Sequence, residues 1–284
     1  MKQQRYHWVP EKGTPLTELD KKVMYWERKG KTVPSRQMIK TPQQIEGIRR
    51  SGLLNTAVLD RVAEKIREGV STACLDRLVY EYTVAHGGFP ATLGYSGFPK
   101  SCCISVNEVV CHGIPDEKEV LQEGDIVNVD CTTILGGYYA DASRMFIIGR
   151  TSPEKEKLVR TARECLTAGM EAARPFGFLG DVGYAVERHA VRNGFSVVRD
   201  FCGHGVGNEF HEDPEVLHYG RRDTGMLLVP GMVFTIEPML NAGTWRVAID
   251  GGNGWTVRTA DGLPSAQWEH TFLITEEGLE IITF

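Results

Sequence analysis

The residues best suited to chemistry are four carboxylates and one imidazole in the last two-thirds of the chain: Asp130, Asp141, His204, Glu237 and Glu269. Five donors are too few for two separate closed metal sites. They suit two hard or borderline divalent ions that share bridging carboxylates and leave coordination positions open to water. Such a centre activates water near neutral pH and polarises a carbonyl group, which indicates a hydrolase.

The clearest strand pattern covers residues 124–149, where two apolar, β-branched segments flank Gly136-Gly137. This pattern predicts a β-hairpin with a two-residue glycine turn. With that turn, Asp130 and Asp141 lie on one face of the hairpin as diagonal neighbours. Such neighbours are about 7–8 Å apart at Cα, within reach of a shared pair of ions. The alternatives are a turn or cap role for Asp130 and a costly unpaired buried charge at Asp141.

A weak internal repeat relates two of the acids. Thr41-Pro42 and Ser152-Pro153 each open a predicted helix, with an N-cap residue followed by proline. The segment Ile-Val-Asn-Val-Asp130 is echoed by Val-Phe-Thr-Ile-Glu237. Each half therefore reads helix, helix, strands, with an acid at a strand end. A duplication that brings two sets of carboxylates to one midline gives a physical reason for a two-metal centre.

Two further elements are expected around this repeat. The helix that opens at Thr41 is predicted to stop at Gly69, because glycine commonly ends helices. A second hairpin, formed by residues 255–259 and 267–275, is predicted to carry Glu269.

Three histidines stand in turn-like or glycine-rich settings. His204 lies in Cys-Gly-His-Gly-Val-Gly, where the glycines let the backbone pass close to a metal or a substrate. His211 follows in Phe-His-Glu-Asp, and His112 stands in a turn after a β-branched segment. These side chains could be the acid–base or carbonyl-binding groups of a hydrolase. The alternative for His204 is a satisfied loop histidine. Glu237 could instead form a salt bridge at an edge strand, and Glu269 could be paired with a nearby arginine.

Composition is typical of a soluble globular protein, with 42% hydrophobic and 24% charged residues in a chain of 284. No apolar segment approaches the roughly 20 residues that span a bilayer, and the N-terminus lacks the apolar core of a signal peptide. The seven cysteines are scattered without a C-x-x-C, which favours reduced thiols and argues against a zinc-finger module. We therefore expect a cytoplasmic protein.

Charge is distributed unevenly. Residues 1–40 contain ten Lys/Arg and four Asp/Glu, a net charge of +6, whereas the remainder contains 22 and 33, a net charge of −11. We expect residues 1–40 to form a basic extension and residues 41–284 to form one domain. Leu16, Leu19, Val23 and Trp26 predict a short amphipathic helix in the extension. The extension could contact RNA or an acidic partner, or it could be merely solvated, whereas the body is not expected to bind nucleic acid through its overall charge.

From about Thr41 to the C-terminus, the chain resembles type I methionine aminopeptidases of the pita-bread fold, in peptidase family M24. The matching strings are TLGYSGFPKSCCISVNEVVCHGIP, GDIVNVD, YYADASRMF, GHGVGNEFHEDP, PGMVFTIEPM and QWEHTFLIT. The separations between the five candidate ligands, 11, 63, 33 and 32 residues, also resemble that family's. The resemblance implies an α+β fold of two pseudo-symmetric halves, with a curved, antiparallel-rich sheet covered by helices.

The resemblance also implies which residues hold the ions. One ion would be bound by Asp130, Asp141 and Glu269, and the other by Asp141, His204, Glu237 and Glu269. The cofactors would be two divalent ions per subunit, and oxygen-rich ligands with one histidine admit Co, Mn, Fe or Zn.

The same resemblance implies that His112 and His211 contact the substrate and act with Glu237 in catalysis. Glu237 would carry the proton from water to the leaving amine. The pocket for the methionine side chain would be lined by Tyr95, Phe98, Cys103, Phe210 and Trp255. An apolar slot with a thiol and aromatic rings suits a thioether.

The activity implied is removal of the N-terminal methionine from nascent polypeptides whose second residue is small, by a monomeric enzyme. Only 26 residues separate His211 from Glu237, which leaves no room for the helical insertion of type II enzymes. The extension has no Cys-rich zinc module, unlike eukaryotic cytosolic type I members, so the chain resembles an extended bacterial form. It also has no P-x-x-P, so an SH3-like partner is not expected. A contact between the basic extension and the ribosome is a further hypothesis.

Two other functions remain open from the sequence. A prolidase or Pro-specific aminopeptidase would share the fold and ligands, although such enzymes usually carry a sizeable extra N-terminal domain. A catalytically silent pita-bread protein that binds partners would have lost metal ligands, whereas all five are present here.

Overall fold

In the computed structural model, which describes residues 6–284, four of the five α-helices begin at a Ser or Thr whose side chain caps the first turn. The five α-helices in this part of the chain are α1 (Glu18–Arg28), α2 (Pro42–Ala63), α3 (Thr72–Ala85), α4 (Pro153–Ala172) and α5 (Leu179–Arg192). The side chains of Thr41 and Ser152 cap α2 and α4, and proline occupies the first position of both helices. The helix starts and the short helix in the extension are confirmed.

Helix α2 ends at Ala63, so the prediction that it continues to Gly69 is wrong. The N–H groups of Lys65 and Ile66 both donate to the carbonyl of Val62, which closes a turn instead of extending the helix. Gly69 lies beyond this turn with a φ of +81°, and its N–H donates to Leu121.

The predicted hairpin is confirmed, including the register that sets the relative positions of Asp130 and Asp141. Strands β4 (Ile126–Leu135) and β5 (Tyr138–Ile147) are joined by Gly136 and Gly137, whose φ values of +60° and +84° suit a tight turn of the type favoured in hairpins. Asp130 pairs with Ser143 and Thr132 pairs with Asp141, so the two acids are diagonal neighbours on one face. Asp130 lies in the middle of β4, however, and not at a strand end.

The hairpin belongs to a nine-stranded sheet with the order β1-β4-β5-β14-β9-β7-β8, in which β2 also pairs with β4 and β15 with β14. Two three-stranded sheets, β13-β10-β6 and β11-β12-β3, complete the strand pairing. The remaining strands are β1 (Phe89–Pro90), β2 (Cys103–Val106), β3 (Val109–Cys111), β6 (Ser196–Val197), β7 (Gly203–Gly205), β8 (Glu212–Val216), β9 (Val233–Ile236), β10 (Met239–Asn241), β11 (Val247–Ile249), β12 (Val257–Thr259), β13 (Ser265–Gln267), β14 (Glu269–Ile274) and β15 (Leu279–Ile281). Two 3₁₀ turns, Arg36–Met38 and Tyr95–Gly97, lie between these elements.

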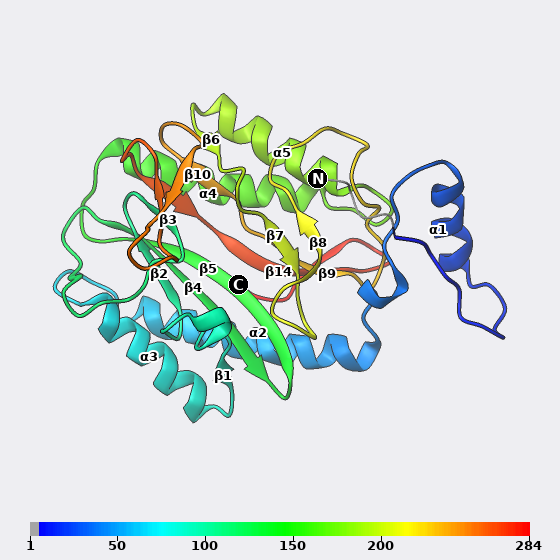
Figure 1. Cartoon of the computed structure of the whole chain (residues 1–284), viewed down its shortest axis with the longest axis horizontal. Helices are drawn as coiled ribbons and strands as arrows, with labels where there is room; N and C mark the ends of the chain where they lie inside the picture. The colour runs from blue at the N-terminus through cyan, green and yellow to red at the C-terminus, as the bar shows by residue number, and fades with distance from the viewer. Residues whose placement is uncertain (1–5) are drawn as a thin grey trace.

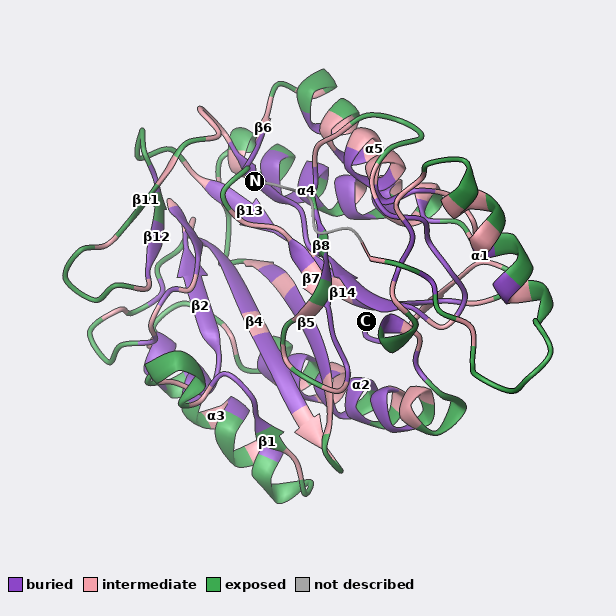
Figure 2. Cartoon of the chain, turned by 45° about the vertical axis from the view of Figure 1, so that its right-hand side comes forward, coloured by how far each residue is buried: buried purple, intermediate pink, exposed green. Residues whose placement is uncertain are grey.

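Two pairs of helices cover the sheet, one for each half of the repeat (Figure 1). Helix α2 packs against β4 and β5, and α4 packs against β9, β10 and β13. Figure 2 shows that the strands are mainly buried, whereas the outward faces of the helices are exposed. The antiparallel strand ladders and the two helix pairs confirm the expected α+β fold in two similar halves.

The second hairpin was predicted wrongly. Strand β12 pairs with β11 and β3, whereas β14, which carries Glu269, pairs with β5, β9 and β15. The connecting segment contains Gly262 and Pro264, and the chain then enters β13, which pairs with β10. The two segments therefore belong to different sheets, and Glu269 lies in the interior of the large one.

The described part of the extension packs onto the second half of the molecule. Trp8, Val23 and Val33 belong to the same buried cluster as Phe234 and Ile236 of β9. Cations of the extension are partly neutralised within the protein: Arg36 pairs with Asp20, for example. Whether residues 1–40 are a separate unit stays a prediction.

The described residues contain neither a membrane-spanning helix nor a disulfide bond. None of the helices in residues 6–284 is both long and apolar enough to cross a membrane. The seven cysteines all lie within this range, and all are free thiols, as predicted.

Candidate metal centre

The register of the large sheet aligns the candidate acids. Asp130 on β4 lies opposite Ser143 on β5, and Ser143 lies opposite Glu269 on β14. Asp141 is two residues from Ser143 on β5, so its side chain is on the same face. Glu237 directly follows β9, which is the neighbour of β14. Because adjacent strands are about 4.8 Å apart, four carboxylates converge on one face of four neighbouring strands.

His204 on β7 faces this cluster. Its Nε2 lies 3.8 Å from a carboxylate oxygen of Asp141 and 3.6 Å from one of Glu237. One donor atom each of Asp141, His204 and Glu269 lie within 4.8 Å of one another. The Nδ1 of His204 is 2.9 Å from the carbonyl oxygen of Gly205, and a proton donated there leaves the Nε2 lone pair directed at the cluster.

Neutral polar side chains orient the carboxylates. Thr132 donates to Asp141 at 2.9 Å, and Thr235 and Gln267 donate to the two oxygens of Glu237 at 2.7 and 3.2 Å. Within residues 6–284, no lysine or arginine lies within 4.0 Å of the four carboxylates, and His204 is their one ion-pair neighbour. Within the described residues, the protein therefore supplies no lysine or arginine to neutralise these carboxylates when they ionise.

Burial changes the ionisation of the whole cluster. It raises the pKa of Asp130 to about 7 and that of Glu237 to about 8. Burial, followed by repulsion from neighbouring carboxylates, also raises the pKa of Asp141 and Glu269 well above their usual range. Burial lowers the pKa of His204 to about 4, which keeps its imidazole neutral at neutral pH. Buried carboxylates and a neutral imidazole without a cation form a donor set that fits divalent metal ions.

His112 reaches the site from the turn that follows β3. Its backbone is left-handed, with a φ of +55°, a strained conformation for a residue with a side chain. The next residue must be glycine, because a Cβ on Gly113 would lie 2.0 Å from the carbonyl oxygen of Ile104. The His112 ring meets Phe201 and Trp255 edge to face, at centroid distances of 5.4 and 6.1 Å.

His211 lies in the loop between β7 and β8. Its Nδ1 is 2.9 Å from the hydroxyl of Tyr95, and its ring centroid is 4.2 Å from the centroids of both His204 and Phe210. Burial, aided by the neighbouring histidines, lowers the pKa of His211 to about 3. The ring therefore enters the site neutral.

A buried ion pair holds this loop. One carboxylate oxygen of Glu212 accepts from the backbone N–H groups of Asn208 and Glu209, at 2.7 and 2.9 Å. The other oxygen pairs with Lys40, whose side chain is only 1% exposed. The extension adds a second contact, because the Tyr6 hydroxyl donates to Asp213 at 2.5 Å.

The residues predicted for the methionine pocket fall into groups around the two histidines. Tyr95 and Phe210 are in contact beside His211, with a centroid distance of 4.7 Å. Phe98 and Trp255 meet edge to face at 5.2 Å, and Trp255 also contacts His112. Cys103 on β2 lies opposite Asp130, on the same face of the sheet. All of the predicted site residues are thus near the cluster or one of its histidines.

Sequence reasoning missed the residues that support the site. Thr132, Thr235 and Gln267 carry no local signal, because their role depends on strand pairing. Lys40 was counted only as a charge of the basic extension, and Glu212 was not singled out. The one available signal was the position of Lys40 between apolar Met38-Ile39 and the helix cap Thr41.

Comparison with known proteins agrees with this geometry. The chain matches the profile of metallopeptidase family M24 over residues 46–276. Methionine aminopeptidase A of Synechocystis is 52% identical over 242 residues, which are 85% of this chain and 95% of that protein. The methionine aminopeptidase of Escherichia coli is 48% identical over 246 residues, which are 86% of this chain and 93% of that protein.

The solved structures similar to this chain include methionine aminopeptidases and prolidases. The methionine aminopeptidase of Rickettsia prowazekii superposes with a TM-score of 0.85 at 43% identity, over 87% of this chain and 99% of that one. The prolidase of Pyrococcus furiosus shares the fold, with a TM-score of 0.67 at 23% identity, but only 65% of that chain is covered. The chain therefore belongs to metallopeptidase family M24 and is more similar to the methionine aminopeptidases than to the prolidases.

Proposed function

We propose that this protein removes the N-terminal methionine from nascent polypeptides whose second residue is small. The observation that carries the proposal is the convergence of four carboxylates and His204 on one sheet face, flanked by His112 and His211. Similarity to methionine aminopeptidases over most of the chain supports the same substrate.

Two divalent ions are proposed as cofactors. Asp130, Asp141 and Glu269 would hold one, and Asp141, His204, Glu237 and Glu269 the other, with the shared carboxylates between them. Bound ions supply Lewis acidity and lower the pKa of water, which a peptide hydrolase needs. Asp141 and Glu269 suit the shared role because they lie on neighbouring strands β5 and β14 between Asp130 and Glu237.

Side chains of the protein carry out proton transfer, oxyanion stabilisation and substrate binding. Glu237 takes a proton from the attacking water and delivers it to the leaving amine, a role that fits a buried carboxylate oriented by Thr235 and Gln267 beside His204. His211 donates a hydrogen bond to the developing oxyanion, and Tyr95 fixes its ring. His112 holds the amide nitrogen side of the scissile bond. The methionine side chain is received by Tyr95, Phe98, Cys103, Phe210 and Trp255.

The test is a peptide panel with metal-stripped protein titrated with Co, Mn, Fe or Zn. Met-Ala-Ser should be cleaved after methionine in a metal-dependent manner, whereas Xaa-Pro peptides should not be. Preference for Xaa-Pro would assign the protein to the prolidase branch instead. Full activity of His204→Ala on Met-Ala-Ser would refute the proposed centre, and metal analysis of the purified protein gives the number of ions.

Contact of the extension with the ribosome remains a proposal, as does the monomeric state. The structure reduces the charge that supports such a contact, because Lys40 is buried and paired with Glu212, which lies outside the extension. Unchanged ribosome co-sedimentation after deletion of residues 1–40 would rule it out.

A further inference from the structure

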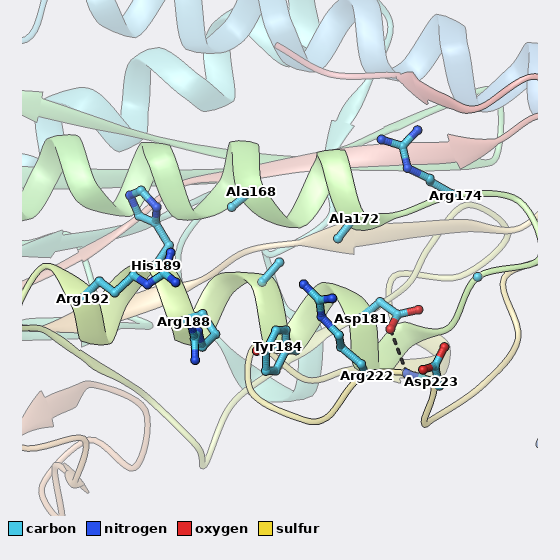
Figure 3. A pocket seen from close by; sticks show the side chains of 12 residues that line it. Ala168, Ala172, Arg174, Asp181, Tyr184, Arg188, His189, Arg192, Arg222 and Asp223 are labelled. Carbon is cyan, nitrogen blue, oxygen red and sulfur yellow. Dashed lines mark hydrogen bonds between the residues drawn. The ribbon is translucent and has the colours of Figure 1, made fainter.

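A second concentration of functional side chains lies on the helices that cover the second half. A pocket of about 550 Å³ opens between α4, α5 and the segment around Arg222 (Figure 3). Four arginines from three segments line it, and we call it the arginine pocket: Arg174, Arg188, Arg192 and Arg222. None of its lining residues belongs to the metal centre or to the predicted substrate site.

The charge of the arginine pocket is not neutralised within the described chain. In residues 6–284, no carboxylate oxygen lies within 4.0 Å of the four guanidinium groups, whereas other surface arginines such as Arg49, Arg144 and Arg258 are paired. Asp181 and Asp223 also line the pocket, which leaves four arginines against two aspartates, and the two oxygens of Asp181 accept the N–H groups of Phe178 and Asp223, at 3.0 and 2.8 Å. The Asp181 carboxylate is therefore already used to cap the start of α5.

Like charges are held close together in the pocket. Arg188 and Arg192 are four residues apart on α5, a spacing at which like charges repel. Arg188 and Arg222 approach Tyr184, with guanidinium carbons 5.6 and 4.9 Å from its ring centroid. Figure 3 shows Ala168 and Ala172 on α4 facing α5, with Arg188 and Arg192 on α5 and Arg222 on the adjoining segment. The small alanine side chains leave space in the pocket for an anionic ligand.

The cationic surface continues onto the extension. Lys31 donates to the carbonyl of Asp223 at 2.8 Å, so the extension adjoins the arginine pocket. A second hollow of about 400 Å³ follows, lined by Lys21, Lys22, Tyr25, Trp26 and Phe176. Lys22 lies 4.6 Å from the centroid of the Phe176 ring, and Phe176 is two residues from Arg174. Cations and aromatic rings therefore alternate from α1 to α5.

We propose that this surface, formed by the arginine pocket and the hollow beside α1, binds RNA through its phosphodiester backbone. Guanidinium groups match phosphate oxygens in a bidentate geometry, and interleaved aromatic rings stack on unpaired bases. The four arginines are exposed and come from three segments, which suits several phosphates along a chain better than one small anion. Because the whole protein has a net charge of −5, its attraction to RNA is local to this surface.

The first measurement is binding of a fluorescent single-stranded RNA of about 20 nucleotides, long enough to exceed a typical single-strand site. The variant is the triple substitution Arg188→Gln, Arg192→Gln, Arg222→Gln in the full chain. Its matched control is Arg61→Gln, Arg77→Gln, Arg258→Gln, which removes the same charge from arginines paired with carboxylates. Hydrolysis of a Met-peptide reports on the metal centre separately and should be unchanged in both variants.

We expect the pocket variant to weaken RNA binding at least tenfold and to reduce the salt dependence of log K by about two units, as loss of three phosphate contacts predicts. The control should change binding less than twofold. Absence of RNA binding by the unmodified protein, or equal losses in the two variants, would overturn the proposal. So would tighter binding of polyglutamate of equal charge, which would assign the surface to an acidic protein. Co-sedimentation with ribosomes then distinguishes ribosomal RNA from free RNA as the source.

Discussion

The two halves of the sheet present their candidate ligands in different ways. In the first half, Asp130 and Asp141 lie on one hairpin of two ten-residue strands, and the ladder alone sets their spacing. In the second half, His204, Glu237 and Glu269 come from strands of three to six residues that are distant in sequence. The first half is therefore a local structure, whereas the second half acquires its geometry only from tertiary contacts.

The two histidines that flank the cluster differ in the same way. His112 is positioned by its own turn, through a left-handed backbone and the close approach of Gly113 to β2. His211 is positioned from a distance, by Tyr95 and by the Lys40–Glu212 ion pair that fastens its loop. The extension is thus joined to the half that depends more on long-range contacts.

The largest expected effect distinguishes Asp130 from Glu237, which occupy equivalent positions in the two halves. Glu237→Gln should lower kcat by at least about 10³-fold, because the substitution removes both a ligand and the proton carrier. Asp130→Asn should lower kcat less, since this substitution weakens the binding of only one ion, and added metal should restore part of the rate. Steady-state kinetics over a metal titration measures both. Equal, metal-insensitive losses would show that the two acids have the same role.

A second comparison separates the two histidines. His211→Ala should lower kcat by about 10²-fold with little change in KM, because its hydrogen bond is needed mainly in the transition state. His112→Ala should also raise KM, since it holds the amide in the bound substrate. If the two variants gave the same kcat and KM pattern on Met-Ala-Ser, the assigned roles would be wrong.

The extension supplies a third test. Lys40→Met leaves Glu212 buried without its partner, so it should reduce the free energy of unfolding by about 3 kcal/mol. It should also lower kcat by about tenfold through displacement of His211, while metal content stays normal. Lys40→Arg should recover part of the free energy of unfolding and part of kcat. Tyr6→Phe, which removes one hydrogen bond, should lower the free energy of unfolding by only about 1 kcal/mol. Loss of metal from Lys40→Met would place its effect in the centre itself.

The same difference explains what could be predicted from the sequence. The hairpin and the helix caps depend on residues close together in the chain, and the hairpin pattern was sufficient to place Asp130 beside Asp141. The pairing of β14 with β5 and β9 is non-local, so residues 255–259 and 267–275 read wrongly as one hairpin. The roles of the candidate site residues stay predictions, although the structure brings them together.

Lys40 shows the same limitation in a single residue. Its position after apolar Met38-Ile39 hints at burial, but nothing nearby identifies its partner, because Glu212 is 172 residues away. The predicted end of α2 was wrong for a different reason: Gly69 is a valid stop signal, but the chain had already turned at residues 62–66. A stop signal sets the latest end of a helix and not the earliest.

The smallest effect concerns the ionisation of the two equivalent acids in metal-free protein. Burial raises the pKa of Asp130 to about 7 and that of Glu237 to about 8, above the value of about 4 in an unfolded chain. Between about pH 4 and pH 8 the folded state then binds more protons than the unfolded state, so stability falls as pH rises across that range. The lowered pKa values of His204 and His211, about 4 and about 3, act in the opposite direction only below about pH 6.5.

Between about pH 6.5 and 8, below the usual pKa of thiols, the Tm of the metal-free protein should therefore fall by roughly a few degrees. Bound metal should remove this fall, because it favours the ionised carboxylates. Glu237→Gln should flatten the profile more than Asp130→Asn, since the folded pKa of Glu237 lies further above its unfolded value. Differential scanning calorimetry with and without chelator measures each profile. A Tm that rises with pH in the chelated protein would mean that the carboxylates are neutralised by the protein and not by metal.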